Sequence, residues 1–295
     1  MQIIFHAFMW RYKDITNQLL EIKQQGFTAV QISPCQGIKG DWNDFVWWKL
    51  YQPIDMRIVN SPLGTKDDIK ELCDKANELG INIIADVILR HAAGLDNGEP
   101  FFHQDVNRDL HRYLNCTQRN CDDYNDRYKY THLATGMPMF NYEDKDFQQI
   151  CKNFLYELKN VGIKGFRLDQ LKHFPVEREG STFLKNVFSD FKDMILYGEV
   201  LNCPTHINDL YVPYMKVCGE GYTSDMRNYV KFFDSHDIYY TFNISKQYND
   251  EMRIQKWRDL LNNNSISDVI YFPHPFETLW KTNEIREINF KFNKR

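Results

Sequence analysis

The chain has 295 residues, of which 43% are hydrophobic and 26% are charged, and these are the values of an ordinary globular protein rather than of a disordered one. A formal net charge of −4, from 36 basic and 40 acidic residues, argues against nucleic acid or an anionic membrane as a partner. No run of about 18 apolar residues is present, and the first residues lack the basic and apolar segments of an export signal. We therefore expect a cytoplasmic protein without a membrane span.

Seven cysteines are spread along the chain. Their number is odd, and Cys116 and Cys121, which come nearest to a pair, have no second pair at zinc-site spacing. The sequence therefore predicts no structural zinc site.

The N-terminal part alternates short β-branched runs with amphipathic helical stretches, which is typical of a parallel sheet built from βα units. Thr65 is the predicted N-cap of one helix, because it directly precedes a run of helical periodicity. Helices are predicted over residues 15–25 and 65–80, and strands over residues 3–8, 29–32 and 81–89.

The alternation stops at residues 92–141, which are polar, contain Asn-Gly and Gly-Met-Pro turns and show no long helical period. A structureless loop of this length would be unusual inside a compact domain. We therefore predict a small subdomain inserted after the third strand.

The alternation resumes after residue 141. Helices are predicted over residues 147–159, 181–192 and 250–261, and strands over residues 165–169, 194–200, 232–234 and 268–272, with a weaker strand near residues 219–224. This gives eight strands in all when the weaker one is included. A (β/α)₈ barrel takes about 250 residues, so we predict a TIM barrel formed by residues 1–91 and 142–295, with a doubly wound sheet as the alternative.

Acidic residues stand at the carboxyl ends of the predicted strands, where barrel enzymes carry their active sites. These residues are Asp86, Asp169, Glu199 and Asp237. A buried carboxylate is costly unless it is paired or functional. One such residue alone would more often be a helix cap or part of an ion pair, but recurrence at four strand ends predicts an active site.

Arg167 stands two residues before Asp169 on one predicted strand, so the two side chains should point to the same face. The guanidinium should then favour the ionised form of Asp169. An ionised carboxylate beside a second carboxyl that donates a proton is what a retaining glycosidase needs, and Glu199 on the next strand is the candidate donor.

The segments around these carboxylates resemble the four conserved segments of the α-amylase superfamily of glycoside hydrolases, in the family's order and at compatible spacing. The matching stretches are Asp86-Val-Ile-Leu-Arg-His91, Gly165-Phe-Arg-Leu-Asp-Gln-Leu-Lys-His173, Gly198-Glu199-Val200 and Phe233-Asp-Ser-His-Asp237. The resemblance implies hydrolysis with retention of configuration, through a covalent glycosyl-enzyme.

The resemblance also implies a role for each carboxylate. Asp169 would attack the anomeric carbon, and Arg167 would orient it. Glu199 would protonate the leaving oxygen and later deprotonate the incoming water. Asp237 would hold sugar hydroxyls most tightly in the distorted transition state. The other matched residues would serve the sugar-binding site, and these are Asp86, His91, Lys172, His173 and His236.

The run Trp47-Trp-Lys-Leu-Tyr-Gln-Pro53 resembles a stretch of animal and bacterial α-amylases. Tyr51 would then be the stacking platform at the cleavage point, with Trp47 and Trp48 lining further subsites. A Trp pair is more often part of a core, but the polar neighbours here indicate a loop, where exposed rings favour binding.

Two positions depart from the family pattern at its structural calcium site. The Asn that precedes the His of the first segment is Arg90 here, and the Asp of the segment that closes the subdomain is Met139. Calcium needs six to eight oxygen ligands, and a guanidinium offers none. We therefore expect no calcium and no other cofactor, with the Arg90 cation bridging barrel and subdomain instead.

The remaining expectations concern the end of the chain and the reaction. Residues 277–295 are too few for the β-sandwich domain that usually follows the barrel in this family, so we expect none. The expected substrate is an α-1,4-glucan such as starch, glycogen or a maltodextrin, hydrolysed internally by a monomer. The alternatives are a transglycosylase of the same superfamily and a weakly active glucan-binding relative.

Overall fold

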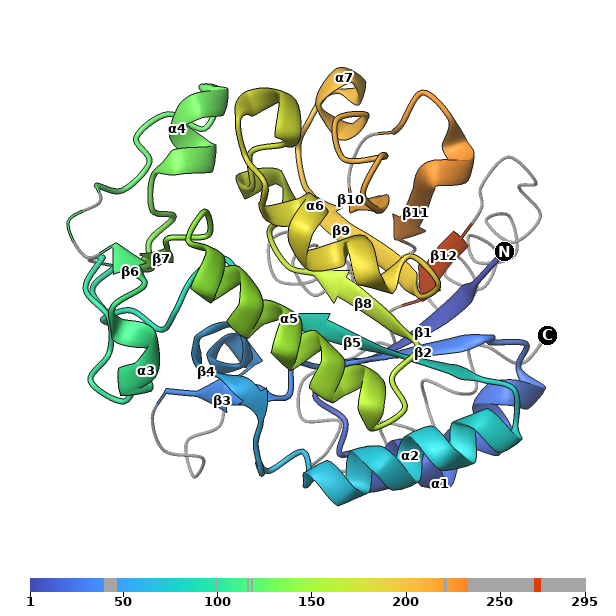
Figure 1. Cartoon of the computed structure of the whole chain (residues 1–295). Coiled ribbons are helices and arrows are strands. Elements are labelled where there is room, and N and C mark those ends of the chain that lie inside the picture. The colour runs from blue at the N-terminus through green and yellow to red at the C-terminus, as the bar shows by residue number, and fades with distance from the viewer. Residues whose placement is uncertain are drawn as a thin grey trace, which may run out of the picture.

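The computed structural model describes residues 1–39, 47–98, 100–115, 117, 119–219, 222–232 and 268–271 of the chain. Within these residues, eight parallel strands form a closed barrel (Figure 1). In chain order they are β1 (Ile3–Ala7), β2 (Ala29–Ile32), β5 (Asn82–Val87), β8 (Gly165–Leu168), β9 (Ile195–Val200), β10 (Lys216–Gly219), β11 (Tyr229–Phe232) and β12 (Asp268–Tyr271). The barrel closes where β12 pairs with β1, with Ile3 opposite Val269. The predicted TIM barrel is therefore confirmed, and the doubly wound sheet is excluded.

Helices pack on the outside of this barrel (Figure 1). They are α1 (Tyr12–Gln24), α2 (Lys66–Glu78), α5 (Lys145–Asn160), α6 (Phe183–Phe188) and α7 (Thr205–Asn208). The side chain of Thr65 accepts a hydrogen bond from the backbone N–H of Asp68, and Asp144 caps α5 in the same way. Local capping thus sets where α2 and α5 begin. Among the residues described, no helix combines the length and the apolar character needed to cross a membrane.

Four predicted elements differ from the observed ones by three residues or more. The helix predicted over residues 15–25 begins three residues earlier, at Tyr12 of α1. The helix predicted over residues 181–192 is the shorter α6, followed by the 3₁₀ turn η5 (Ser189–Phe191). The strands predicted near residues 219–224 and 232–234 begin three residues earlier, as β10 and β11. The helix predicted over residues 250–261 lies outside the described residues.

The stretch between β5 and α5 has only short elements, as the sequence predicted. They are α3 (Arg108–His111), β6 (Leu114–Asn115), α4 (Arg127–His132) and β7 (Met139–Phe140), and β6 pairs with β7 in antiparallel fashion. A second small sheet pairs β3 (Gln36–Ile38) with β4 (Pro53–Ile58), and the 3₁₀ helix η2 (Trp47–Tyr51) connects to it. In Figure 1 these elements lie to one side of the barrel.

The interior of the barrel is filled by fully buried side chains from seven of its strands. These residues are Ile4, Ala29, Ile84, Tyr197, Cys218, Val230 and Ile270. A filled barrel of this kind has no pore. A pocket must therefore lie at an end of the barrel. At the carboxyl end, the short 3₁₀ turns η3 (Leu171–His173) and η4 (Glu177–Glu179) follow β8. The turn η6 (Met226–Asn228) precedes β11 and lies at the other end.

Candidate active site

The guanidinium of Arg167 on β8 is the centre of the candidate site. Its Nη1 donates to Asp86 on β5 at 2.8 Å and to Asp169 at 2.8 Å, and its Nη2 donates to Glu199 on β9. Three predicted carboxylates, from three neighbouring strands, thus meet one buried cation. The prediction that Arg167 and Asp169 share a face is confirmed. Asp237 and His236 lie outside the described residues.

Burial dominates the electrostatics of this cluster. The pKa of Asp169 is raised well above its ordinary value by desolvation, which outweighs the opposing effect of Arg167. The same cause raises the pKa of Asp86. The net direction for Asp169 is therefore the reverse of the one expected from the Arg167 pair alone, because the sequence shows the neighbouring cation but not the depth of burial.

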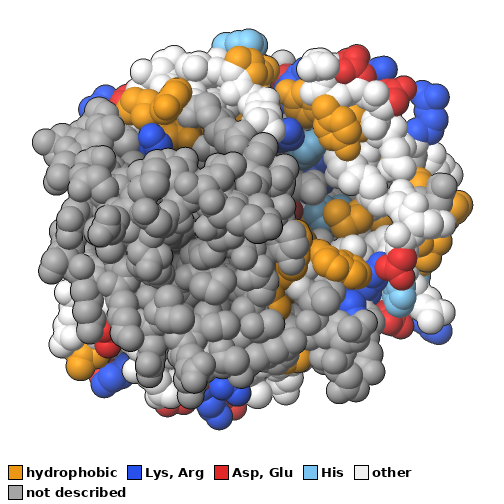
Figure 2. Space-filling view, turned by 180° about the vertical axis from the view of Figure 1, so that it is seen from behind, with side chains coloured by type: hydrophobic (Ala, Val, Ile, Leu, Met, Phe, Trp, Pro, Cys, Tyr) orange, Lys and Arg blue, Asp and Glu red, His pale blue; other side chains and the backbone are white. Residues whose placement is uncertain are grey.

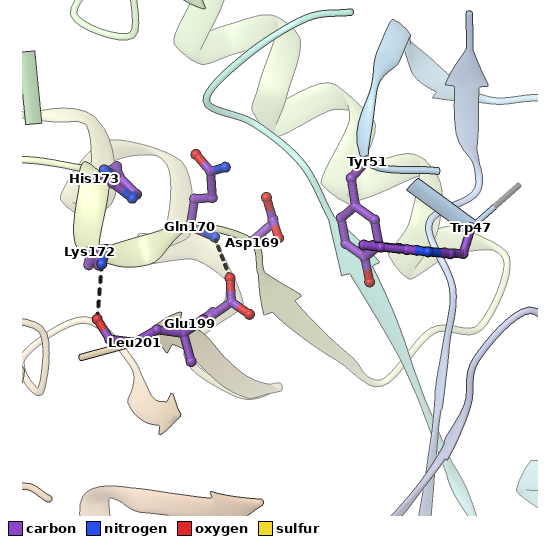
Figure 3. A pocket seen from close by; sticks show the side chains of 8 residues that line it. All are labelled: Trp47, Tyr51, Asp169, Gln170, Lys172, His173, Glu199 and Leu201. Carbon is purple, nitrogen blue, oxygen red and sulfur yellow. Dashed lines mark hydrogen bonds between the residues drawn. The ribbon is translucent and has the colours of Figure 1, made fainter. Parts of the chain in front are cut away.

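A pocket of about 280 Å³ opens beside these carboxylates. It is lined by Trp47, Tyr51, Asp169, Gln170, Lys172, His173, Glu199 and Leu201 (Figure 3). In Figure 3 the two aromatic side chains lie on one side and the residues that follow Asp169 on the other, so the carboxylates lie between an aromatic and a polar wall. In the view from behind, histidine, basic and hydrophobic side chains gather around a hollow in the described surface (Figure 2).

Gln170 and Leu201 line the pocket but were missed in the sequence. Gln170 has φ of +51°, a left-handed conformation that is uncommon for a residue with a side chain. Its backbone N–H points at Glu199, 3.4 Å from Oε2, and the Nζ of Lys172 donates to the carbonyl oxygen of Leu201 at 3.0 Å (Figure 3). Contacts of this kind depend on the path of the backbone, which no residue pattern reveals.

The aromatic wall is tied to the carboxylates. The hydroxyl of Tyr51 donates to Asp86 at 3.0 Å, and the ring of Trp47 meets the Tyr51 ring edge-on with centroids 6.2 Å apart. Trp48, by contrast, lines a different pocket of about 590 Å³, where the Nζ of Lys39 lies 5.7 Å from its ring. Although Trp47 and Trp48 are neighbours in the 3₁₀ helix η2, their side chains therefore line two separate pockets.

Both described histidines of the predicted set are buried and neutral. One ring nitrogen of His91 (Nε2) lies 2.8 Å from the carbonyl oxygen of Tyr51, and Nδ1 of His173 lies 2.7 Å from that of Tyr130. Burial lowers the pKa of His91 to about 4 and that of His173 to about 3. Since a carbonyl only accepts, Nδ1 of His173 must carry the hydrogen. His173 lines the pocket, whereas His91 is buried and is not among the lining residues.

Arg90 stands at the sequence position where the family resemblance implies a calcium ligand. Its side chain is buried, and its Nη2 donates to the carbonyl oxygens of Thr131 at 3.1 Å and Leu133 at 3.0 Å. Burial lowers its pKa to about 10, which leaves it a cation at neutral pH. The nearby Met139 offers only a soft thioether, and within the described ranges no group of three or more His, Cys, Asp and Glu side chains could hold a metal. These residues do not fit a calcium ion.

The chain is similar to proteins that are already known. The chain is 28% identical over 326 residues to an α-amylase from Clostridium acetobutylicum, a match that covers 97% of this chain and 43% of that protein. The chain therefore spans less than half the length of that relative.

Two solved structures share the fold. One is a variant of α-amylase I from Eisenia fetida in complex with maltohexaose, with a TM-score of 0.75, 16% identity, and coverage of 92% of this chain and 66% of that one. The other is a three-domain cyclomaltodextrin glucanotransferase, with a TM-score of 0.71, 18% identity, and coverage of 91% and 64%. The family model described as the α-amylase catalytic domain matches residues 11–271, and the chain belongs to this family.

Proposed function

We propose that this chain carries a retaining glycoside hydrolase activity that cleaves internal α-1,4-glucosidic bonds of starch, glycogen or maltodextrins. The observation that carries the proposal is that Asp169 and Glu199 bond to the two terminal nitrogens of one guanidinium and line one pocket. Carboxyl groups about 5–5.5 Å apart are typical of retaining enzymes, and groups about 6.5–9.5 Å apart of inverting ones. A shared guanidinium favours the shorter separation.

The reaction would take two steps on these side chains. In the first, Asp169 attacks the anomeric carbon while Glu199 gives its proton to the leaving oxygen, so the glycosidic bond breaks and an ester forms. In the second, Glu199 takes a proton from water, and the water oxygen displaces Asp169. Arg167 stabilises the negative charge on Asp169 before the attack and after its release.

The walls of the pocket suit a chain of sugars. The rings of Trp47 and Tyr51 offer apolar faces for the C–H side of a glucose ring, while Lys172 and His173 offer polar atoms for its hydroxyls. The pocket beside Trp48 would take further glucose units. Asp237 would contribute as the family resemblance implies.

The stereochemistry of the first product tests the proposal. Proton NMR during hydrolysis of maltoheptaose should show the α-anomer of the new reducing end before mutarotation. If the β-anomer came first, the retaining mechanism would be wrong.

The transglycosylase alternative is supported by the fold that the chain shares with a glucanotransferase. An acceptor sugar would then replace water in the second step. Products longer than the maltoheptaose substrate, or cyclic ones, would favour this alternative. Binding of amylose without release of reducing ends anywhere from about pH 5 to 8 would instead favour a weakly active binding protein.

A further inference from the structure

The short helix α4 packs against η3, the turn that carries Lys172 and His173 into the pocket. A helix of six residues has little stability of its own, so its position depends on the groups that hold its two ends. One arginine side chain holds each end.

Arg127, the first residue of α4, holds the turn η3 that follows β8. Its Nη1 donates to the carbonyl oxygen of Lys172 at 2.8 Å, and its Nη2 donates to that of Phe174 at 3.1 Å. Its Nε and Nη2 also donate to the two carboxylate oxygens of Glu179, at 2.9 and 2.7 Å. The hydroxyl of Tyr211 completes the arrangement. It accepts from Nη1 at 2.8 Å, and its single hydrogen lies between the same two carbonyl oxygens, which are 2.8 and 3.0 Å away.

Arg90 holds the other end of α4. Its Nη2 donates to the last carbonyls of the helix and its cap, those of Thr131 and Leu133, which have no partner within the helix. The carbonyl of Tyr130, 3.4 Å from the same nitrogen, also accepts from Nδ1 of His173. One backbone carbonyl thus lies between Arg90 and a side chain of the pocket.

We propose that Arg90 and Arg127, here called the arginine clamp, are positioning residues that hold Lys172 and His173 in the pocket without a bound calcium ion. A guanidinium is planar and has five donors, so each clamp residue can satisfy several carbonyl oxygens at once, as a multivalent cation would. The carbonyl oxygens that surround the Arg90 guanidinium already accept hydrogen bonds from it. The part of this inference that concerns catalysis rests on the proposed function.

The variants Arg127→Met and Arg127→Lys test the clamp, with Arg227→Met as the matched control. Arg227 has an exposed guanidinium paired with Asp225 and lies before β11, at the opposite end of the barrel from the pocket. Arg127→Met should raise KM for maltoheptaose by ~10-fold or more, with a much smaller change in kcat, because Lys172 and His173 bind sugar rather than react. Arg227→Met should leave both constants unchanged.

Arg127→Lys separates positioning from stability. The lysine ammonium keeps the ion pair with Glu179 but cannot bond to the carbonyl oxygens of both Lys172 and Phe174. The Tm of this variant should therefore lie within ~2 °C of the wild-type value, while its KM stays raised. A wild-type KM in this variant would overturn the positioning role.

The claim that no calcium ion is needed can be tested by thermal unfolding, without measuring activity. The Tm of the wild-type protein should stay within ~1 °C after treatment with EDTA and after addition of CaCl₂, whereas Arg90→Met should lower it in both media. If EDTA lowered the Tm of the wild-type protein and Ca²⁺ restored it, the claim that no calcium ion is needed would be wrong. If the wild-type protein released no reducing ends at all, the proposed function would fail while this measurement still tested the clamp.

Discussion

Arg167 brings together carboxylates that would otherwise repel one another. Its side chain is 4% exposed, and the side chains of Asp86, Asp169 and Glu199 around it are 0, 8 and 11% exposed. Buried charges of one sign are tolerated only when an opposite charge bonds to them directly. Among the described residues of the site, it is therefore the cation that allows Asp169 and Glu199 to lie at one pocket.

The role of Glu199 is tested by Glu199→Gln, which keeps the shape of the side chain and removes its proton. The kcat for maltoheptaose should fall by about 10²–10⁴-fold, the usual contribution of a general acid, while the Kd changes little. Initial rates and titration calorimetry on the same preparation measure the two constants. Glu78→Gln, on the outer surface of α2, is the control. Equal losses of rate and binding would show that Glu199 only supports the structure.

His173 predicts how stability depends on pH. Its pKa of about 3 lies below the unfolded value of 6.5, chiefly because of burial, with Arg90, Lys172 and His91 acting in the same direction. The folded state therefore binds fewer protons than the unfolded state below pH 6.5, so stability present above that pH is lost as pH falls towards 3.

Urea unfolding at pH 7 and at pH 4.5 measures this contribution. The loss of unfolding free energy between the two pH values should be about 2–3 kcal/mol smaller in His173→Gln than in the wild type. Burial raises the pKa values of Asp86 and Asp169, so their contribution has the opposite sign, but it is common to both proteins and cancels in the comparison. If the wild type and His173→Gln lost the same unfolding free energy between the two pH values, His173 would not be held neutral in the folded state.

At the scale of elements, β9 positions the turn η3 through a residue without a side chain. A Cβ built on Gly198 would lie 2.7 Å from Cβ of Leu171 and 2.5 Å from one of its methyl groups. Leu171 is fully buried and is followed by Lys172 and His173. The missing side chain at Gly198 therefore lets the turn lie against the strand.

Gly198→Ala should therefore lower both stability and activity, by displacing η3. Overpacking of this kind typically costs about 1–3 kcal/mol, which calorimetric Tm and urea unfolding would detect. The double variant with Leu171→Ala should be less destabilised than the sum of the two single changes, because truncation removes the methyl group at 2.5 Å and leaves only the contact with Cβ at 2.7 Å. Strict additivity would show that the two residues do not press on each other.

At the scale of the whole molecule, a buried aspartate joins the starts of three barrel strands, at the end of the barrel opposite to the pocket. Asp268, the first residue of β12, accepts from the Nζ of Lys216 at 2.6 Å and from the backbone N–H of Gln2 at 2.6 Å. Its side chain is 4% exposed. It thus joins the starts of β12 and β10 to the residue before β1.

Asp268→Asn should lower the unfolding free energy by about 1–3 kcal/mol, since it removes a charge-assisted bond from a buried site. The KM and kcat should not change, because the residue lies at the end of the barrel opposite to the pocket. Lys216→Met should give a similar loss of stability. A large change in KM for either variant would mean that the two ends of the barrel are coupled.

The sequence by itself determined the fold and most of the site. Hydrophobic periodicity and caps such as Thr65 are local, so they predicted the long helices and the buried strands, and strand-end carboxylates in a fixed order predicted Asp86, Asp169 and Glu199 at one rim. The strands β10 and β11 were placed three residues too late along the chain.

Only the tertiary structure decided how these residues act on one another. Burial reversed the expected direction for the pKa of Asp169, and the backbone path brought Gln170 into the pocket. The neighbouring residues Trp47 and Trp48 line different pockets, because they point in different directions from one 3₁₀ helix. No sequence pattern predicts that Arg127 bonds to the carbonyl oxygens of Lys172 and Phe174. Every residue has a backbone carbonyl, and only the fold decides which of them a distant side chain reaches.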